Sequence, residues 1–278
     1  MTYTMDITDS PQEILPGVIF YSYHSAVRRE KVFLWNHPTL IFQVSGHFTL
    51  ETPVQTVVIE GGELLLIGKN QVGTMTKVPP PGAPYETIVI SLQETLLRTI
   101  ALEESIKPDG PYQGLPNRKI PVNDFLKGYL QSVVPYARHA GPEITDALGL
   151  LKVKEVVLLL LQTLPELRNF LFDFSAPHKI DLEKFMLNHF RFNIPLDQFA
   201  QLTGRSLSAF KRDFRQVFGS PPRQWLQDKR LDHARYLIGT RKRKASEVYL
   251  EVGFQSLSHF SYAFKQKFGH PPSGRNAP

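Results

Sequence analysis

Short apolar runs, separated by Gly, Pro and Asn, fill the first third of the chain. They extend from about residue 15 to residue 92 and are rich in Val, Ile, Phe, Tyr and Thr. Runs of this kind are typical of β-strands, and their spacing predicts a small barrel or sandwich. The stretch EGGE at Glu60–Glu63 predicts a turn, because glycine can adopt a positive φ.

Beyond Leu92 the apolar positions recur every three to four residues, which predicts helices as far as about residue 172. Predicted helices lie within Glu94–Ser105, Val122–Ala140 and Pro142–Phe172. In the last of these, Leu and Val surround most of the circumference, so the helix must be buried on more than one side. Either its own domain or a second subunit could cover it.

The last third of the chain contains nearly the same sixteen residues twice. LSAFKRDFRQVFGSPP begins at Leu207, and LSHFSYAFKQKFGHPP begins at Leu257. Spacings of three and four residues predict that the apolar positions of each copy share one buried helix face. These positions are Leu207, Phe210, Phe214, Val217 and Phe218 in the first copy, and Leu257, Phe260, Phe264 and Phe268 in the second.

The ends of both predicted helices carry matching signals. Ser206 and Ser256 can cap the first turns by accepting a backbone N–H, while Gly219 and Gly269, each followed within two residues by Pro-Pro, end the helices. The polar residues differ between the copies, which indicates one scaffold that reads two different surfaces. The outward set is Ser208, Lys211, Arg212 and Arg215 in the first copy, and Ser258, His259, Ser261, Tyr262 and Lys265 in the second.

A second short helix precedes each copy, so the pattern predicts two helix-turn-helix units, at about 196–218 and 245–268. In such a unit the second helix enters the DNA major groove. The stretch Pro222–Ile238 predicts one long helix between the units. Reading helices held about 34 Å apart would enter successive grooves on one side of a duplex. The run RKRK at Arg241–Lys244 is expected to contact phosphate.

Charge and cysteine content narrow the possible functions. The net charge is +6, but residues 178–278 carry 18 Lys and Arg against 8 Asp and Glu, whereas the preceding residues are mildly acidic. A basic module predicts a polyanionic partner.

The chain has no cysteine, which excludes disulfides, thiolate catalysis and sulfur-based metal sites and fits a reducing compartment. We see no secretory signal, and the longest strongly apolar run, Val156–Leu161, is too short for a membrane span.

These residues resemble the DNA-binding domain of AraC/XylS-type transcription regulators. EVGFQSLSHFSYAFKQKFGHPPS at Glu251–Ser273 follows the signature of that family, and RLDHARYLI at Arg230–Ile238 is similar to its linker helix. Tyr249 departs from a usually small position, and the tail PSGRNAP lacks the usual Tyr-Arg ending. The resemblance implies DNA contacts, with Arg215 and Lys265 on phosphates. The full set expected is Ser208, Lys211, Arg212, Arg215, Leu257, Ser258, His259, Ser261, Tyr262 and Lys265.

The resemblance also implies an α+β chain of two domains. We expect a cupin-like β-barrel with following helices at 1–172 (barrel about 15–92, helices about 93–172), a linker at 173–179 and an all-α domain at 180–278. In such regulators the first domain binds a small-molecule or protein effector, and the helix within Ile144–Leu164 would form a homodimer. The partners implied are double-stranded DNA and RNA polymerase, in the cytoplasm.

The expected function is therefore a transcription regulator, in particular an activator, and not an enzyme. One alternative is a cupin-type metalloenzyme with an appended DNA-binding module. Cupin metal sites need His and Glu at short spacing, but His24, His37 and His47 stand alone, so neither a metal nor another cofactor is expected. DNA repair by a methyl-accepting cysteine is impossible without cysteine. An architectural DNA binder without sequence preference remains a further alternative.

Overall fold

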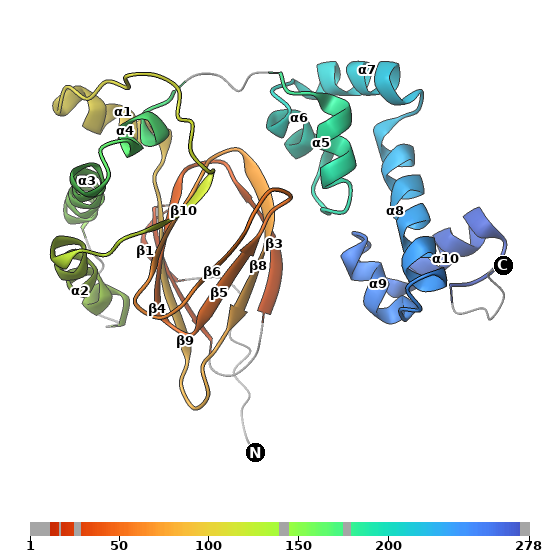
Figure 1. Cartoon of the computed structure of the whole chain (residues 1–278), viewed down its shortest axis with the longest axis horizontal. Helices are drawn as coiled ribbons and strands as arrows, with labels where there is room; N and C mark the ends of the chain where they lie inside the picture. The colour runs from red at the N-terminus through yellow and green to blue at the C-terminus, as the bar shows by residue number, and fades with distance from the viewer. Residues whose placement is uncertain (1–11, 17, 25–28, 139–144, 175–178, 273–278) are drawn as a thin grey trace. The chain divides into compact units, whose positions relative to one another are not determined.

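The chain forms two compact units, Met1–Ser175 and Ala176–Pro278, in a computed structural model (Figure 1). The structure describes residues 12–16, 18–24, 29–138, 145–174 and 179–272. The predicted linker, the tail PSGRNAP and the start of the predicted dimerisation segment lie partly or wholly outside these residues. The predicted α+β class is confirmed: strands and helices make up the first unit, and the described part of the second is helical. The finer boundaries stay predictions.

The strands of the first unit form two antiparallel sheets. One sheet has the order β1-β2-β9-β4-β7-β10 and the other has the order β3-β8-β5-β6. Strands β1, β8 and β10 lie outside the apolar runs from which strands were predicted. The strands are β1 Gln12–Leu15, β2 Ile19–His24, β3 Arg29–Trp35, β4 Thr39–Ser45, β5 His47–Glu51, β6 Thr56–Ile59, β7 Leu64–Ile67, β8 Gln71–Val78, β9 Tyr85–Ser91 and β10 Asn117–Ile120.

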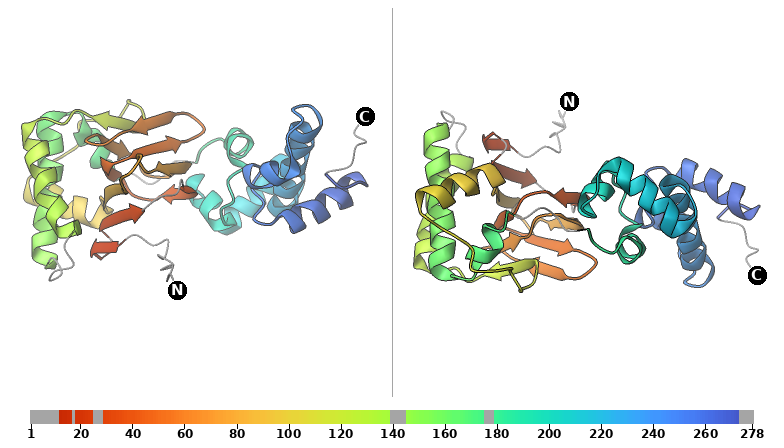
Figure 2. Two further views of the ribbon diagram at one scale, coloured as in Figure 1. Left: turned by 90° about the horizontal axis from the view of Figure 1, so that it is seen from below. Right: turned by 90° about the horizontal axis from the view of Figure 1, so that it is seen from above.

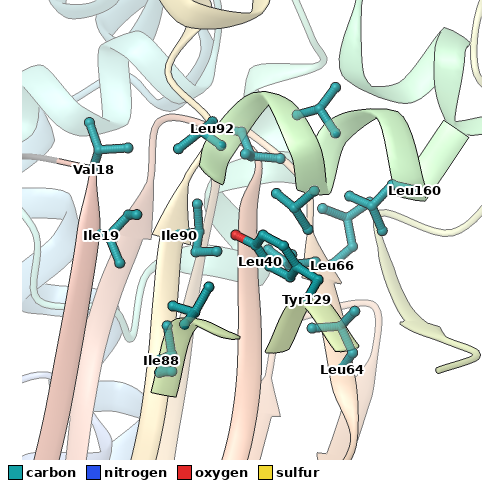
Figure 3. Close-up of a cluster of buried hydrophobic side chains, with 14 of the residues drawn as sticks. Val18, Ile19, Leu40, Leu64, Leu66, Ile88, Ile90, Leu92, Tyr129 and Leu160 are labelled. Carbon is teal, nitrogen blue, oxygen red and sulfur yellow. The ribbon is translucent and has the colours of Figure 1, made fainter. Parts of the chain in front are cut away.

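Strand β7 shows why its sequence reads as a continuous apolar run. Leu64 and Leu66 belong to the core between the first sheet and the helices, which Figure 3 draws. Leu65 and Ile67 belong instead to the core that both sheets share. Alternate side chains of a strand point to opposite faces, so a strand buried on both faces carries no polar position. This fixes the register of β7 with its neighbouring strands, because a slip of one residue would turn the side chains of each core toward the other.

Four helices complete the first unit: α1 Glu94–Glu103, α2 Asp124–Arg138, α3 Asp146–Thr163 and α4 Leu167–Leu171. Both views of Figure 2 show the green helices along one side of the strands. The prediction of one helix across 142–172 was wrong, because α3 ends at Thr163, two residues before Pro165, and a separate short helix follows. Among the described residues, no helix is both long and apolar enough to cross a bilayer.

Helix α3 is apolar around most of its surface, but the structure covers only part of it. Val153, Val156, Val157 and Leu160 are buried against the sheet. By contrast, Leu151 is 62% exposed, and Leu148 and Leu150 are also exposed. The N-terminal half of α3 therefore presents an apolar surface that the described residues of the first unit leave uncovered.

The second unit contains six described helices. Figure 1 shows α8 running between the group α5–α7 and the pair α9–α10. Helix α8 has 18 residues, which corresponds to a length of about 27 Å. The helices are α5 Leu182–His189, α6 Leu196–Leu202, α7 Leu207–Phe218, α8 Pro222–Gly239, α9 Ala245–Glu251 and α10 Leu257–Phe268.

Replacing Phe264 by Asp should unfold α9 and α10. Phe264 is 2% exposed within the core of these helices, and its ring packs 5.6 Å from that of Phe260. Loss of a buried Phe costs about 3–5 kcal/mol, and the buried carboxylate adds to that cost. Amide hydrogen exchange of peptides from 245–268 should rise strongly. The matched control is Tyr262→Asp, on the exposed face of the same helix; equal exchange in the two variants would contradict the assignment.

Candidate nucleic-acid interface

Helix α7 is held by the caps and the aromatic face that its sequence predicts. The Ser206 hydroxyl accepts a hydrogen bond from the Ala209 N–H at 3.3 Å, and Gly219 ends the helix at φ 67°. Phe210 and Phe214 are fully buried, with ring centroids 5.4 Å apart. Burial of this face leaves the opposite face of α7 to solvent.

The outward side chains of α7 lie where the sequence places them: Ser208, Lys211, Arg212 and Arg215 are all exposed. Two members of the predicted inner set were assigned wrongly. Val217 is 48% exposed and Leu207 is 38% exposed. Both lie within one turn of a helix end, where the supporting helices no longer cover the whole apolar stripe.

Helix α10 repeats this construction. The Ser256 hydroxyl accepts from the His259 N–H at 3.4 Å, Gly269 ends the helix at φ 79°, and Phe260 and Phe264 are buried. The predicted contact residues lie on its outward face with different exposure. Leu257 is 40% exposed, so its assignment to the buried face was wrong, as it was for Leu207. Ser261 is partly buried, and the remainder are exposed: Ser258, His259, Tyr262 and Lys265.

A chain of ion pairs orients Arg212. The Arg205 guanidinium donates to one carboxylate oxygen of Asp213 at 3.1 Å, and Arg212 donates twice to the other oxygen at 3.1 and 3.2 Å. The hydrogen bond from Arg205, followed by the effects of Arg212, lowers the pKa of Asp213 below its ordinary value. Asp213 therefore stays ionised and restricts the Arg212 side chain on the outward face. The spacing of α7 did not indicate this role, because Arg205 precedes the helix.

A hollow of about 690 Å³ lies beside the outward face of α7. Its lining includes Lys211, Arg212 and Arg215 of α7 and Arg223 from the first turn of α8. Sequence reasoning missed Arg223, because it belongs to the predicted connecting helix rather than to a reading helix. Four cationic side chains around one hollow make a site for an anionic group such as a phosphate.

Several other basic residues have intramolecular partners. Lys267 forms ion pairs with Asp228 at 3.2 Å and Asp232 at 2.9 Å, which fasten α10 to α8. Arg243 pairs with Glu251, and Arg241 donates to the Tyr236 hydroxyl. Within the run Arg241–Lys244, only part of the charge is therefore available for the expected phosphate contact.

The first unit offers no comparable polar site in its described part. No group of three or more His, Cys, Asp or Glu side chains lies close enough together there to hold a metal ion. His47 lies 3.5 Å from Glu60, and both side chains are exposed. In the shared core of the two sheets, large apolar side chains occupy the space: Trp35, Ile41, Phe48, Leu50, Val57, Ile59, Leu65 and Ile67.

Comparisons with known proteins match both units. The model of the ExsA N-terminal regulatory domain matches residues 38–170, and the model of a helix-turn-helix domain matches residues 199–275. The chain is 26% identical over 257 residues to the HTH-type transcriptional regulator ExsA of Pseudomonas aeruginosa, covering 86% of this chain and 89% of that protein. It is 34% identical over 92 residues to the virulence regulon transcriptional activator VirF of Yersinia enterocolitica, covering 33% and 34%.

A solved structure of ToxT from Vibrio cholerae aligns with 92% of this chain and 97% of that one, at 14% identity and a TM-score of 0.44. The two family models cover most of the chain, in the order regulatory domain and then helix-turn-helix domain. The chain belongs to the AraC-type family of transcription regulators.

Proposed function

We propose that this protein is a sequence-specific DNA-binding transcription activator that reads two adjacent major-groove segments with α7 and α10. One observation carries the proposal. Two capped helices bury the same aromatic positions and expose different polar faces, within a unit that is strongly basic. A scaffold repeated with altered outward residues fits two different base sequences at fixed spacing.

The outward residues divide by chemistry. Arg212, oriented by Asp213, suits a guanine edge, which an arginine can bind through two hydrogen bonds. Lys211, Ser208, Ser261 and Tyr262 offer further donors to bases. We assign Arg215, Arg223 and Lys265 to phosphates, because contacts with the DNA backbone position a reading helix without carrying sequence information. Leu257, Ser258 and His259 complete the second surface.

The first unit would supply regulation and dimerisation. We assign the homodimer contact to the exposed leucines of α3, since they form the uncovered half of an otherwise buried helix. A small-molecule or protein effector would act on the same unit. The name of VirF describes a transcriptional activator, and we propose activation, with RNA polymerase as partner, here too. Such a regulator acts on cytoplasmic DNA, and the proposal contains no catalytic step.

Selection of bound sequences from random duplex DNA by the full-length protein tests this function. A regulator should enrich a site with two conserved segments about one helical turn apart, and should prefer it over random duplex by roughly 10³–10⁷-fold. Enrichment of no sequence, with uniform binding, would identify an architectural DNA binder instead.

Arg212→Ala and Arg215→Ala should have different effects on DNA binding. Loss of a base contact should cost about 1–3 kcal/mol at one base position and relax preference there, whereas loss of a phosphate contact should weaken binding to all sequences alike. Quantitative binding to a library with single-base changes in the selected site measures both. An unchanged base preference in Arg212→Ala would reject its role in base recognition.

Lys265→Ala should flatten the salt dependence of binding, and Lys267→Ala should not. Each phosphate contact contributes a slope of about −0.9 in a plot of log K against log salt concentration. Lys265 is exposed, whereas Lys267 is engaged by Asp228 and Asp232. Titrations at several salt concentrations should give a smaller slope for Lys265→Ala alone. Equal slopes in both variants would place Lys265 away from the DNA.

Leu151→Lys should convert a homodimer to a monomer, because it places a charge on the exposed apolar part of α3. Sedimentation equilibrium of the full-length protein measures the change. Leu102→Lys is the matched control, since Leu102 in α1 is 83% exposed but lies outside the proposed contact. A dimer that persists in Leu151→Lys would assign dimerisation to another surface.

A further inference from the structure

The guanidinium of Arg230, in the middle of α8, lies between the two halves of the DNA-binding unit. It donates to the carbonyl oxygens of Phe190 at 2.8 Å and Phe192 at 2.9 Å, which belong to the end of α5 and the segment that leads to α6. It also donates to the carbonyl oxygen of Gly253 at 3.2 Å, in the turn between α9 and α10. One side chain therefore joins three backbone segments that are distant in sequence.

The three acceptors are all backbone carbonyl oxygens, and none is a carboxylate. Burial lowers the pKa of Arg230 to about 10, so the group remains charged at neutral pH. A buried cation is costly unless its donors are satisfied. Phe190 caps the C-terminal end of α5, where carbonyl oxygens lack intrahelical partners and carry partial negative charge. The carbonyls and the guanidinium thus satisfy one another.

Gly253 gives independent evidence that the two halves are in contact. Its φ is +92°, and a Cβ atom placed there would lie 2.4 Å from the carbonyl oxygen of Arg191 and 3.0 Å from the Arg230 side chain. A separation under 3.0 Å requires that the backbone move. The turn of the second helix-turn-helix thus packs directly on the segment that precedes the first.

Hydrophobic contacts attach the two reading helices to different parts of α8. The buried cluster around α9 and α10 consists of residues from Leu231 onward. On the other side, α7 packs on the start of α8 through Phe214 and Trp225, whose ring centroids lie 5.5 Å apart. Both reading helices are therefore attached to α8, one near its start and one near its end. Arg230 lies between Trp225, which packs on α7, and the residues of α8 that join the buried cluster of α9 and α10.

We propose that Arg230 is a positioning residue that fixes the separation and angle of α7 and α10, and so sets the spacing of the two DNA segments that the protein accepts. The claim about the spacing of DNA segments rests on the proposed function, whereas the claim about the geometry of α7 and α10 does not. Arginine is suited to this role because its planar fork directs several donors at once, whereas lysine offers a single point of attachment. We call these contacts of Arg230 the carbonyl clamp.

The first test measures geometry without DNA. The chain has no cysteine, so spin labels attach only at Val217→Cys in α7 and Gln266→Cys in α10, both at exposed positions. The distance distribution between the labels should be narrow in the otherwise unchanged protein and broader or displaced in Arg230→Met, with Arg230→Lys between the two. Lys229→Met, at the adjacent position of α8, is the matched control. A distribution in Arg230→Met equal to that of the parent would overturn the proposal.

The second test measures spacing. Affinity is compared between the selected site and the same site with one base pair inserted or deleted between its segments. Discrimination should fall about tenfold in Arg230→Met, within the range of a single mismatched base pair, while binding to each segment alone stays unchanged. Unchanged discrimination between the two spacings, or an equal fall in Lys229→Met, would overturn the role of the clamp in spacing. If the parent protein selects no site, the proposed function fails and the label distances still judge the clamp.

A further pair of variants covers the case in which Arg230→Met does not fold. Gly253→Ala and Gly219→Ala both place a side chain at a positive φ. Only Gly253 has atoms close to the added Cβ, whereas Gly219 has none within 4 Å. Gly253→Ala should broaden the label distances and reduce spacing discrimination, and Gly219→Ala should change neither. Equal behaviour of the two would overturn the proposal.

Discussion

The phenylalanines at i and i+4 in α7 and α10 determine which residues of this protein can meet DNA. Phe210 and Phe214, like Phe260 and Phe264, are almost fully buried. A helix that buries one stripe of large rings has no freedom to rotate about its axis, because rotation by one residue would expose a ring and bury a charge. Side-chain caps and left-handed glycines then fix where each helix begins and ends. The outward face follows from these constraints rather than from its own sequence.

Because α7 and α10 share the same buried aromatic positions, their outward faces can differ without loss of support. In α7 the face is cationic, and Asp213 with Arg205 restrains Arg212. In α10 the face carries hydroxyls, an imidazole and an exposed Tyr262, and the basic Lys267 is directed to carboxylates of α8 instead. The two helices thus have equal supports but different recognition chemistry.

Local signals explain which features the sequence could predict. The caps, the buried Phe residues and the exposure of Lys211, Arg212 and Arg215 depend on residues within one helix, and the repeat made each signal visible twice. The prediction of burial was wrong at Leu207, Val217 and Leu257, where burial depends on how far the neighbouring helices reach. Strands β1 and β10 lie at sheet edges and are short, so their pairing with β2 and β7 leaves little periodic pattern. Arg223 and Arg230 act through contacts with segments distant in sequence, which spacing alone does not reveal.

Backbone acceptors make the carbonyl clamp compatible with changing specificity. Arg230 binds the backbone oxygens of Phe190, Phe192 and Gly253, and a backbone oxygen is present whatever the residue type. Position 253 must nevertheless stay glycine, because an added Cβ would clash with the backbone. A change of outward residue on α7 or α10 touches none of these groups. Base preference can therefore change while segment spacing is kept, because one property depends on exposed side chains and the other on a buried cation and the main chain. If Arg230 paired with a carboxylate instead, the spacing of the DNA segments would depend on one more side chain that substitution can change.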